Sequence, residues 1–247
     1  TEGFDKYTET VKAGSKEVQV ANNVSNRFLN REARFYNTVF FQNRRWHVTN
    51  NVTQFHKGSP NELSGTIYTH TGYMLYKRFN REVSMKSPGV QNKFRPSIIF
   101  RLADLYLLYA EAVNEVDGQL DQLGIECLNQ VRRRAYGYAP TTANSEIDFT
   151  AADFPDQKSV QDYLFVERAR ELCFEGFRRY DLIRWNKLAD TLDDFAVKFN
   201  AAVADGTLKS YVWAAGKYFE AGKHELYPIP AYEIRETKGS LVQNPKY

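Results

Sequence analysis

YLFVERARELCFEGFRRYDLIRW, residues 163–185, carries the strongest structural signal in the chain. Within it Glu167, Glu171 and Glu175 recur at every fourth position, so their carboxylates stack along one face of a helix. Like charges at this spacing repel one another, and they repel more when they are buried. Such a face therefore requires cations between the carboxylates. The pattern predicts one long helix from Val160 to about Asn186.

The cations that separate these carboxylates are expected to form a structural ion-pair network with them. On the same helix, Glu175 and Arg179 have the favourable i, i+4 order. Arg101 on an earlier helix and Arg132–Arg134 on the next can supply bidentate partners across the packing. The predicted network consists of Arg101, Glu167, Arg168, Glu171, Glu175 and Arg179.

Two neighbouring carboxylates can also perform acid–base chemistry. Glycoside hydrolysis uses two carboxyl groups about 5–10 Å apart, and that alternative assigns the chemistry to Glu167 and Glu171. We favour the ion-pair network, because perturbed carboxylates are common in structural networks. These residues also lie among apolar residues in mid-helix, not on a loop that lines a cleft. We therefore expect no enzyme activity.

Helical periods extend to both sides of this segment. One apolar stripe advances by three or four residues, as one helix face does; it consists of Ile98, Leu102, Leu105, Tyr109, Ala112 and Val116. A second series runs from Leu120 to Ala135, so the two helices form an αα-hairpin. Leu188 to about Ala204 is the expected partner of the long helix. The sequence predicts a mainly α fold of tetratricopeptide-like helical hairpins, with long irregular loops and a few short strands.

The first hundred residues have a different character. They hold 15 Lys and Arg against 7 Asp and Glu, whereas the remainder holds 18 against 23. RFYNTVFF (34–41) and GTIYTHTGYMLYKRF (65–79) alternate partly and are bounded by turn residues, which is typical of short strands joined by loops. We therefore divide the chain into a loop-rich region, 1–96, and a helical-hairpin region with a C-terminal loop, 97–247.

Several collinear segments together resemble the SusD/RagB family. They are RLADLYLLYAEAVNE (101–115), LNQVRRRA (128–135), ERARELCFEGFRRYDLIRW (167–185), ELYPIPAYEI (225–234) and the terminal QNPKY (243–247). NREARFYNTVFFQNRRW (30–46) is similar to a segment that the family carries further upstream. Two positions depart from the family pattern: Ala33 stands where proline is usual, and Lys246 stands where glycine is usual.

This resemblance implies the C-terminal part of one SusD-like domain, an α-α superhelix whose N-terminal half and lipidated cysteine are absent from the chain. It implies a surface-exposed protein of the bacterial outer membrane, held there only by that N-terminal lipid anchor. Such a protein binds a nutrient, most often an oligosaccharide, for a SusC-type TonB-dependent transporter. A peptide ligand is the alternative within the family, and a tetratricopeptide-like protein-interaction module is the alternative outside it.

Glycan capture requires flat aromatic faces flanked by hydrogen-bonding groups. The chain holds 17 Phe, 16 Tyr and 3 Trp. Those in the helical region follow helical periods, which favours core packing. The loop-rich region is therefore the expected ligand side, and the candidate ligand-binding residues are Arg44, Arg45, Trp46, His47, Tyr68, Tyr73 and Tyr76.

Other chemistries lack their sequence signatures. The four histidines show no paired metal-ligand spacing, so no metal or cofactor is expected. A chain with a net charge of +3 and no basic stripe is not expected to bind nucleic acid. Cys127 and Cys173 fall beside apolar residues on predicted helices, which favours free thiols and leaves open a bridge between the hairpins.

Overall fold

A computed structural model of the chain describes residues 4–5, 10–13, 16–19, 24–25, 28–46, 51–54, 73–78, 98–193, 197–202, 208–213 and 220–247. His47 and Tyr68, two of the candidate ligand residues, lie outside these ranges. The chain divides into two compact units, one of residues 1–175 with 199–211 and the other of residues 176–198 with 212–247. The predicted boundary between 96 and 97 concerns sequence character and stays a prediction.

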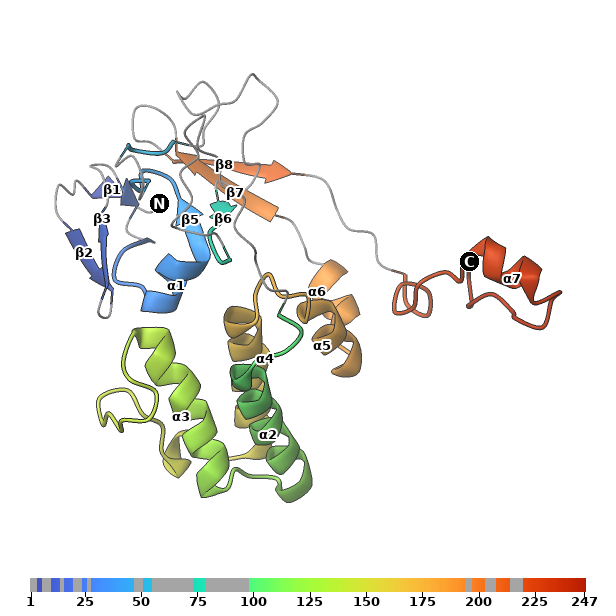
Figure 1. Ribbon diagram of the computed structural model, residues 1–247, viewed down its shortest axis with the longest axis horizontal. Coiled ribbons are helices and arrows are strands. Elements are labelled where there is room, and N and C mark those ends of the chain that lie inside the picture. Colours follow the sequence, from blue (N-terminus) through green and yellow to red (C-terminus); the bar gives the residue numbers. More distant parts are fainter. Residues whose placement is uncertain are drawn as a thin grey trace. The chain divides into compact units, whose positions relative to one another are not determined.

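Three helices form the centre of the first unit: α2 (Leu102–Asp117), α3 (Gln122–Tyr136) and α4 (Gln157–Glu171). Figure 1 shows α2 beside both α3 and α4. A short connection joins α2 to α3, which confirms the predicted αα-hairpin. The core between the three helices is built from Leu107, Ala110, Leu128, Val131, Val160 and Leu164.

Local sequence explains where these helices begin and end. The Asp121 carboxylate accepts a hydrogen bond from Gly124 N at 2.6 Å, and the Asp156 carboxylate accepts one from Ser159 N at 2.7 Å. Each thereby satisfies a backbone donor that has no partner within its helix. Gly118 ends α2 with a φ of 71°, a left-handed conformation that glycine adopts without steric cost.

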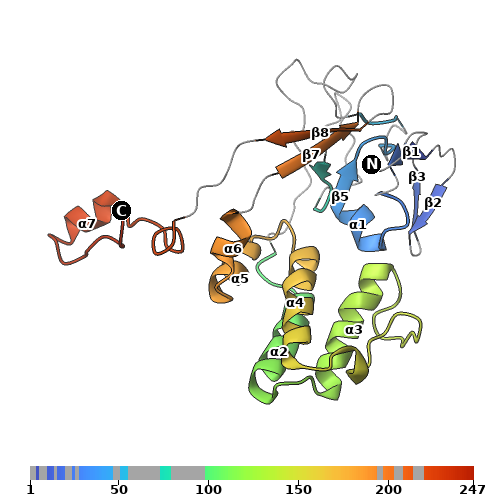
Figure 2. The same ribbon diagram turned by 180° about the vertical axis from the view of Figure 1, so that it is seen from behind.

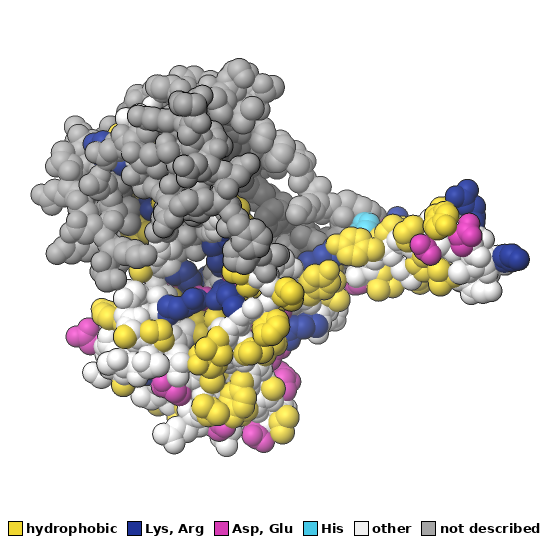
Figure 3. All heavy atoms as spheres, in the orientation of Figure 1, with side chains coloured by type: hydrophobic (Ala, Val, Ile, Leu, Met, Phe, Trp, Pro, Cys, Tyr) yellow, Lys and Arg dark blue, Asp and Glu magenta, His cyan; other side chains and the backbone are white. Residues whose placement is uncertain are grey.

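The buried face of α2 is not the predicted one. Its buried residues are Asp104, Leu107, Ala110, Glu111 and Asn114. In the predicted stripe, Leu102, Leu105 and Val116 are 59%, 47% and 82% exposed, and Figure 3 shows hydrophobic side chains gathered on the surface near this helix. Polar residues with partners occupy the buried face instead, since Arg168 Nη1 binds Asp104 Oδ1 at 2.8 Å. The spacing of apolar residues alone therefore predicted the wrong face of α2 as the buried one.

The prediction of one helix from Val160 to Asn186 is also wrong, because α4 ends at Glu171. Phe174 and Gly176 follow with φ values of 62° and 91°. Left-handed residues interrupt the hydrogen-bond ladder of a right-handed helix, so the chain turns before the next helix begins.

Beyond this turn the elements are short. They are α5 (Arg178–Arg184), α6 (Leu188–Asp193), β7 (Val197–Ala202), β8 (Leu208–Trp213) and α7 (Ala231–Glu236). β7 pairs with β8, so the predicted helix from Leu188 to Ala204 is correct only for α6. The sequence of β7, VKFNAA, begins with alternating apolar and polar residues, a pattern that favours a strand.

The loop-rich region forms small pieces of secondary structure, as predicted. They are β1 (Phe4–Asp5), β2 (Thr10–Ala13), β3 (Lys16–Gln19), β4 (Val24–Ser25), α1 (Ala33–Thr38), β5 (Val39–Phe41) and β6 (Tyr73–Leu75). β1 pairs with β4, β2 with β3, and β5 with β6, each antiparallel. Figure 2 shows β5 continuing directly from α1. The strand expected over 34–41 is thus correct only from Val39 onward.

In the second unit the terminal QNPKY segment binds the backbone of the proline-rich segment before α7. Gln243 both donates to Ile229 O, at 2.9 Å, and accepts from Ile229 N, at 2.7 Å. Asn244 Nδ2 donates to Tyr227 O at 2.7 Å. Lys246, at the position where glycine is usual, has a φ of 68°, the left-handed region that favours glycine. These hydrogen bonds hold the terminal QNPKY motif against the ELYPIPAYEI motif.

Both cysteines are free thiols in the structure: Cys127 is buried on α3, whereas Cys173, predicted on a helix, is half-buried in the turn after α4. Burial raises the pKa of each thiol. Within the described ranges no helix has the length and apolar character needed to cross a membrane. Among the same residues no group of His, Cys, Asp or Glu is arranged to hold a metal ion.

Candidate functional site

Three aromatic residues beside the β5–β6 pair form a cluster that we call the aromatic patch: Phe40, Trp46 and Tyr76. Phe40 and Tyr76 are buried, and Trp46 is half-buried against them. The Trp46 ring meets Phe40 at a centroid distance of 5.2 Å and an angle of 64°, and meets Tyr76 at 6.3 Å and 71°. Edge-to-face contacts of this kind are favourable, so the indole is held on a fixed base.

Tyr73 presents an exposed aromatic ring on the other face of the β5–β6 pair, because Phe40 and Phe41 point to opposite faces of β5. It lies opposite Phe41 in the β5–β6 register and is 37% exposed. Its ring stands edge-on to Phe28, with centroids 5.8 Å apart and an angle of 88°. Met74 and Leu75 beside it are also exposed. This strand therefore presents apolar side chains outward from a packed interior.

Arg44 supports the patch from within. It is only 8% exposed, and its Nη1 donates to Tyr36 O at 2.8 Å and to Val39 O at 3.0 Å. Its guanidinium also lies 4.6 Å from the centroid of the Tyr76 ring, a cation–π distance. These contacts and the burial of Tyr76 favour structural roles for both residues.

Of the candidate ligand residues within the described ranges, Arg45, Trp46 and Tyr73 are the most accessible. Arg45 is half-buried and forms a backbone bridge with Val52. The structure brings Trp46 and Tyr76 together and places Tyr73 against Phe28, and the ligand-binding role of these residues stays a prediction.

The ion-pair network is centred on Glu171. This carboxylate is 1% exposed. Its Oε2 lies 2.7 Å from Arg34 Nη1, and its Oε1 lies 2.5 Å from Arg101 Nη1. Arg134 Nη2 binds the same Oε1. Glu171 therefore joins α4 to α1, to α3 and to the residue that precedes α2.

The other two carboxylates extend the network in both directions along the chain. Arg34 Nη1 lies 2.6 Å from Glu167 Oε1, so one guanidinium bridges two glutamates. Glu175 Oε2 lies 2.8 Å from Arg101 Nε, and its Oε1 lies 2.5 Å from Lys77 Nζ. All three carboxylates are less than 6% exposed. Their mutual repulsion is thus balanced by cations from four other parts of the chain.

The charges of this network alter its pKa values. Burial acts to raise the pKa of Glu171, but Arg134, Arg34 and Arg101 outweigh it and hold that pKa below the ordinary value. The same balance, with Arg101 and Lys77 as the cations, lowers the pKa of Glu175. Both groups are therefore ionised at neutral pH.

Two members of the predicted network lie elsewhere. Arg168 is buried and pairs with Asp104 on α2, at 2.8 Å, and not with the stacked glutamates. Arg179 belongs to the second unit, where its Nη2 donates to His224 O at 2.6 Å. The predicted i, i+4 pair of Glu175 and Arg179 required a continuous helix, and the helix ends before both residues.

Two cations of the network were missed: Arg34 and Lys77. They lie 133 residues before Glu167 and 94 residues before Glu171, respectively, so no local spacing indicates them. Lys77 has a further role. Its Nζ donates to Glu171 O at 2.7 Å and to Cys173 O at 3.2 Å, which caps the negative end of α4. It thereby fastens the end of β6, and with it the aromatic patch, to the helical bundle.

These features define a class: a scaffold of helical hairpins whose buried charges hold a loop-rich aromatic surface in place. The family model described as the SusD family matches residues 3–247, so the chain belongs to the SusD family. Its fold class is the expected one, mainly helical and SusD-like.

Individual relatives agree with this assignment. The chain is 37% identical over 102 residues to SusD-like protein P25 of Formosa agariphila, which covers 41% of the chain and 18% of the relative. It is 36% identical over 95 residues to SusD-like protein P38 of the same organism, covering 38% of the chain and 18% of the relative. The solved structure described as selenomethionine BT4246 shares the fold, with a TM-score of 0.68 at 23% identity. That match covers 98% of this chain and 41% of the other.

Proposed function

We propose that this chain binds an oligosaccharide nutrient without catalysis and delivers it to a SusC-type TonB-dependent transporter. Binding and delivery would take place at the bacterial surface. A lipid anchor upstream of this sequence would attach the protein to the outer membrane. The observation that carries the proposal is the match of the SusD family model to residues 3–247. The matches span only 18% of the length of each relative, so the activity proposed here goes beyond the part that they share with the chain.

The aromatic patch supplies a physical means of binding. Trp46 in the patch offers a ring for the apolar side of a sugar, Tyr73 offers a second ring on the other face of the β5–β6 pair, and Arg45 offers hydrogen-bond donors. Arg44 and Lys77 hold the patch to the backbone and to α4. A surface fixed in this way has less conformational entropy to lose when a ligand binds.

The ion-pair network supports the non-catalytic part of the proposal. Glu167 and Glu171, the carboxylates of the glycosidase alternative, are 3% and 1% exposed and bind arginines. A sugar cannot reach them without displacing Arg34 from both.

Isothermal titration of the 247-residue chain tests this function. The titrants are neutral oligosaccharides, acidic oligosaccharides and hexapeptides, with chromatography of each mixture afterwards. We expect saturable binding of an oligosaccharide and no product. Binding of peptides alone would favour the other ligand class of the family, and no binding of any titrant would contradict the proposal. Sugar release that disappears in a folded Glu171→Gln variant would establish the glycosidase instead.

One observation favours a second function, that of a protein-interaction module. Leu102, Leu105 and Val116 form an exposed apolar stripe on α2, and an amphipathic helix can bury such a stripe. Under this alternative, the chain retains a soluble protein partner in a pull-down, and serine at these three positions abolishes that retention. Equal retention by the parent chain and the variant would contradict it.

A further inference from the structure

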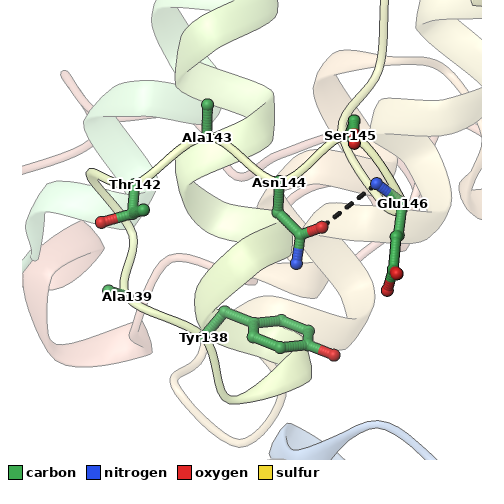
Figure 4. A pocket seen from close by; sticks show the side chains of 7 residues that line it. All are labelled: Tyr138, Ala139, Thr142, Ala143, Asn144, Ser145 and Glu146. Atoms are coloured by element: carbon green, nitrogen blue, oxygen red, sulfur yellow. Dashed lines mark hydrogen bonds between the residues drawn. The ribbon is translucent and has the colours of Figure 1, made fainter.

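The connection from α3 to α4 contains a surface cavity of about 440 Å³. Small-molecule sites commonly have volumes of about 300–1,000 Å³, so this cavity has room for a small ligand. It is lined by residues of one loop, 138–146, and lies in the first unit away from the residues of the aromatic patch in sequence. Figure 4 shows the loop curving round it.

Three side chains from different parts of the loop point toward the same space: Tyr138, Asn144 and Glu146 (Figure 4). Tyr138 is 46% exposed and supplies an aromatic surface. Asn144 Oδ1 accepts a hydrogen bond from Glu146 N at 3.1 Å, which fixes the amide with its nitrogen directed into the loop. A ring face, an amide donor and a carboxylate acceptor are the groups that recognise a sugar ring.

A buried arginine fixes both ends of this loop. Arg133 is 2% exposed. Its Nη1 donates to Pro140 O at 2.8 Å, and its Nε and Nη2 donate to the two Asp148 carboxylate oxygens at 2.7 and 2.6 Å. The same guanidinium binds Glu126 on α3 at 2.8 Å. The fork geometry of arginine therefore ties the start and end of the loop to one helix.

Further bonds fix the interior of the loop. Asp148 Oδ2 accepts from Asn144 N at 2.8 Å. Asn129 on α3 binds both backbone groups of Phe149, donating to the carbonyl at 3.0 Å and accepting from the amide at 2.7 Å. A loop ordered before binding loses little entropy when a ligand enters, so these bonds lower the entropic cost of binding at the loop.

We propose that the 138–146 loop is a second carbohydrate-binding site that holds one neutral pyranose unit. Tyr138 stacks on the apolar face of the sugar, the Asn144 amide donates to a hydroxyl oxygen, and Glu146 accepts from hydroxyl groups. Glu146 makes the site unfavourable for uronate or sulfated sugars, because a like charge would lie beside it. The proposal rests on the proposed glycan-binding function and adds a second point of contact to it.

Nuclear magnetic resonance of the ¹⁵N-labelled chain tests the site, with maltotriose, cellotriose and laminaritriose as probes. We expect saturable shifts of the backbone amides of residues 142–146 with at least one probe. Tyr138→Ala weakens this binding about tenfold, whereas Tyr138→Phe retains it. Tyr232→Ala, which removes another exposed tyrosine, serves as the matched control and leaves it unchanged.

Two further arms separate this inference from the proposed function. In Trp46→Ala the loop shifts should persist, because the two sites are independent. Sugar binding that leaves every loop amide unshifted, or that survives Tyr138→Ala undiminished, overturns the second site and leaves the proposed function standing. No sugar binding anywhere overturns both. Tighter binding of trigalacturonate than of the neutral probes at the loop amides overturns the assignment to a neutral sugar.

Discussion

Eight charged side chains around Glu171 form a neutral cluster. The carboxylates are Glu32, Glu167, Glu171 and Glu175, and the cations are Arg34, Lys77, Arg101 and Arg134. A buried charge without a partner is costly, whereas a fully paired set is tolerated. The balance explains how Glu167 and Glu171 on α4 and Glu175 in the turn after it can be buried together.

Glu171→Gln should destabilise the protein strongly. The change leaves Arg34, Arg101 and Arg134 facing a neutral group, and breaking one partner of a buried ion pair costs about 3–5 kcal/mol. Urea unfolding of the 247-residue chain measures the loss. Glu115→Gln, at an exposed position on α2, is the matched control and should change the free energy of unfolding by no more than about 0.5 kcal/mol. Equal stability of the two variants would contradict the network.

The lowered pKa values of Glu171 and Glu175 predict acid sensitivity. A carboxyl group whose pKa is depressed by folding stabilises the native state above its unfolded pKa, about 4.3 for glutamate. That contribution is lost as the pH falls through the lower, folded pKa. The free energy of unfolding should therefore decrease below pH ~4.3, and less steeply in Glu171→Gln. Parallel pH profiles for the two proteins would refute this assignment of the charges.

At this scale the sequence predicted the carboxylates but only part of their partners. Glu167, Glu171 and Glu175 are detectable because a helical period relates them. Arg101 was found because a packed helix places it nearby. Arg34 and Lys77 could not be found by spacing, since tertiary structure alone brings them to α4.

At the level of elements, the contact between the end of β6 and the end of α4 joins the strand beside the aromatic patch to the helical bundle. Lys77 follows β6 and binds the carbonyls of Glu171 and Cys173 as well as the Glu175 carboxylate. A cation at the C-terminus of a helix interacts favourably with its dipole. The strand that carries Tyr73 is therefore held by a helix in the packed bundle.

Lys77→Met should weaken both stability and ligand binding, because it releases β6 from α4 and loosens the aromatic patch. Loss of a charged hydrogen bond costs about 1.5–3 kcal/mol. Denaturant unfolding and oligosaccharide titration of the variant provide the two readouts. Lys158→Met is the matched control: its ion pair with Asp162 is exposed, and such pairs contribute about 0–1 kcal/mol. Oligosaccharide affinity unchanged in Lys77→Met would show that the patch does not depend on this link.

A helix end has a signal in the sequence where a cap marks it, as at Asp121, Gly118 and Asp156. The predicted start at Val160 did not use the Asp156 cap. The end of α4 depends on left-handed Phe174, a residue type that seldom adopts that conformation, so period alone carried the predicted helix too far.

For the whole molecule, the exposed stripe on α2 is the main departure from expectation. Periodicity identifies an apolar face but not the surface that covers it. Contiguous exposed apolar side chains promote association, and here they include Leu102, Leu105 and Val116. The family motifs nevertheless indicated the fold correctly, because they lie in the helices and in the paired C-terminal segments.

This stripe predicts that the 247-residue chain self-associates at high concentration. Lysine at Leu105 and Val116 should make it monomeric by electrostatic repulsion, with unfolding free energy nearly unchanged because both side chains are exposed. Sedimentation velocity over a range of concentrations measures the effect. A monomeric parent chain would contradict it, as would a variant that associates to the same extent.

The central claim is that the aromatic patch binds an oligosaccharide. Titration of Trp46→Ala with the oligosaccharide that binds the parent chain most tightly tests it directly. Trp185→Ala, in the second unit, is the matched control. We predict at least about tenfold weaker binding for Trp46→Ala and parent affinity for Trp185→Ala, both with native circular dichroism. Parent affinity in a folded Trp46→Ala variant would contradict the claim.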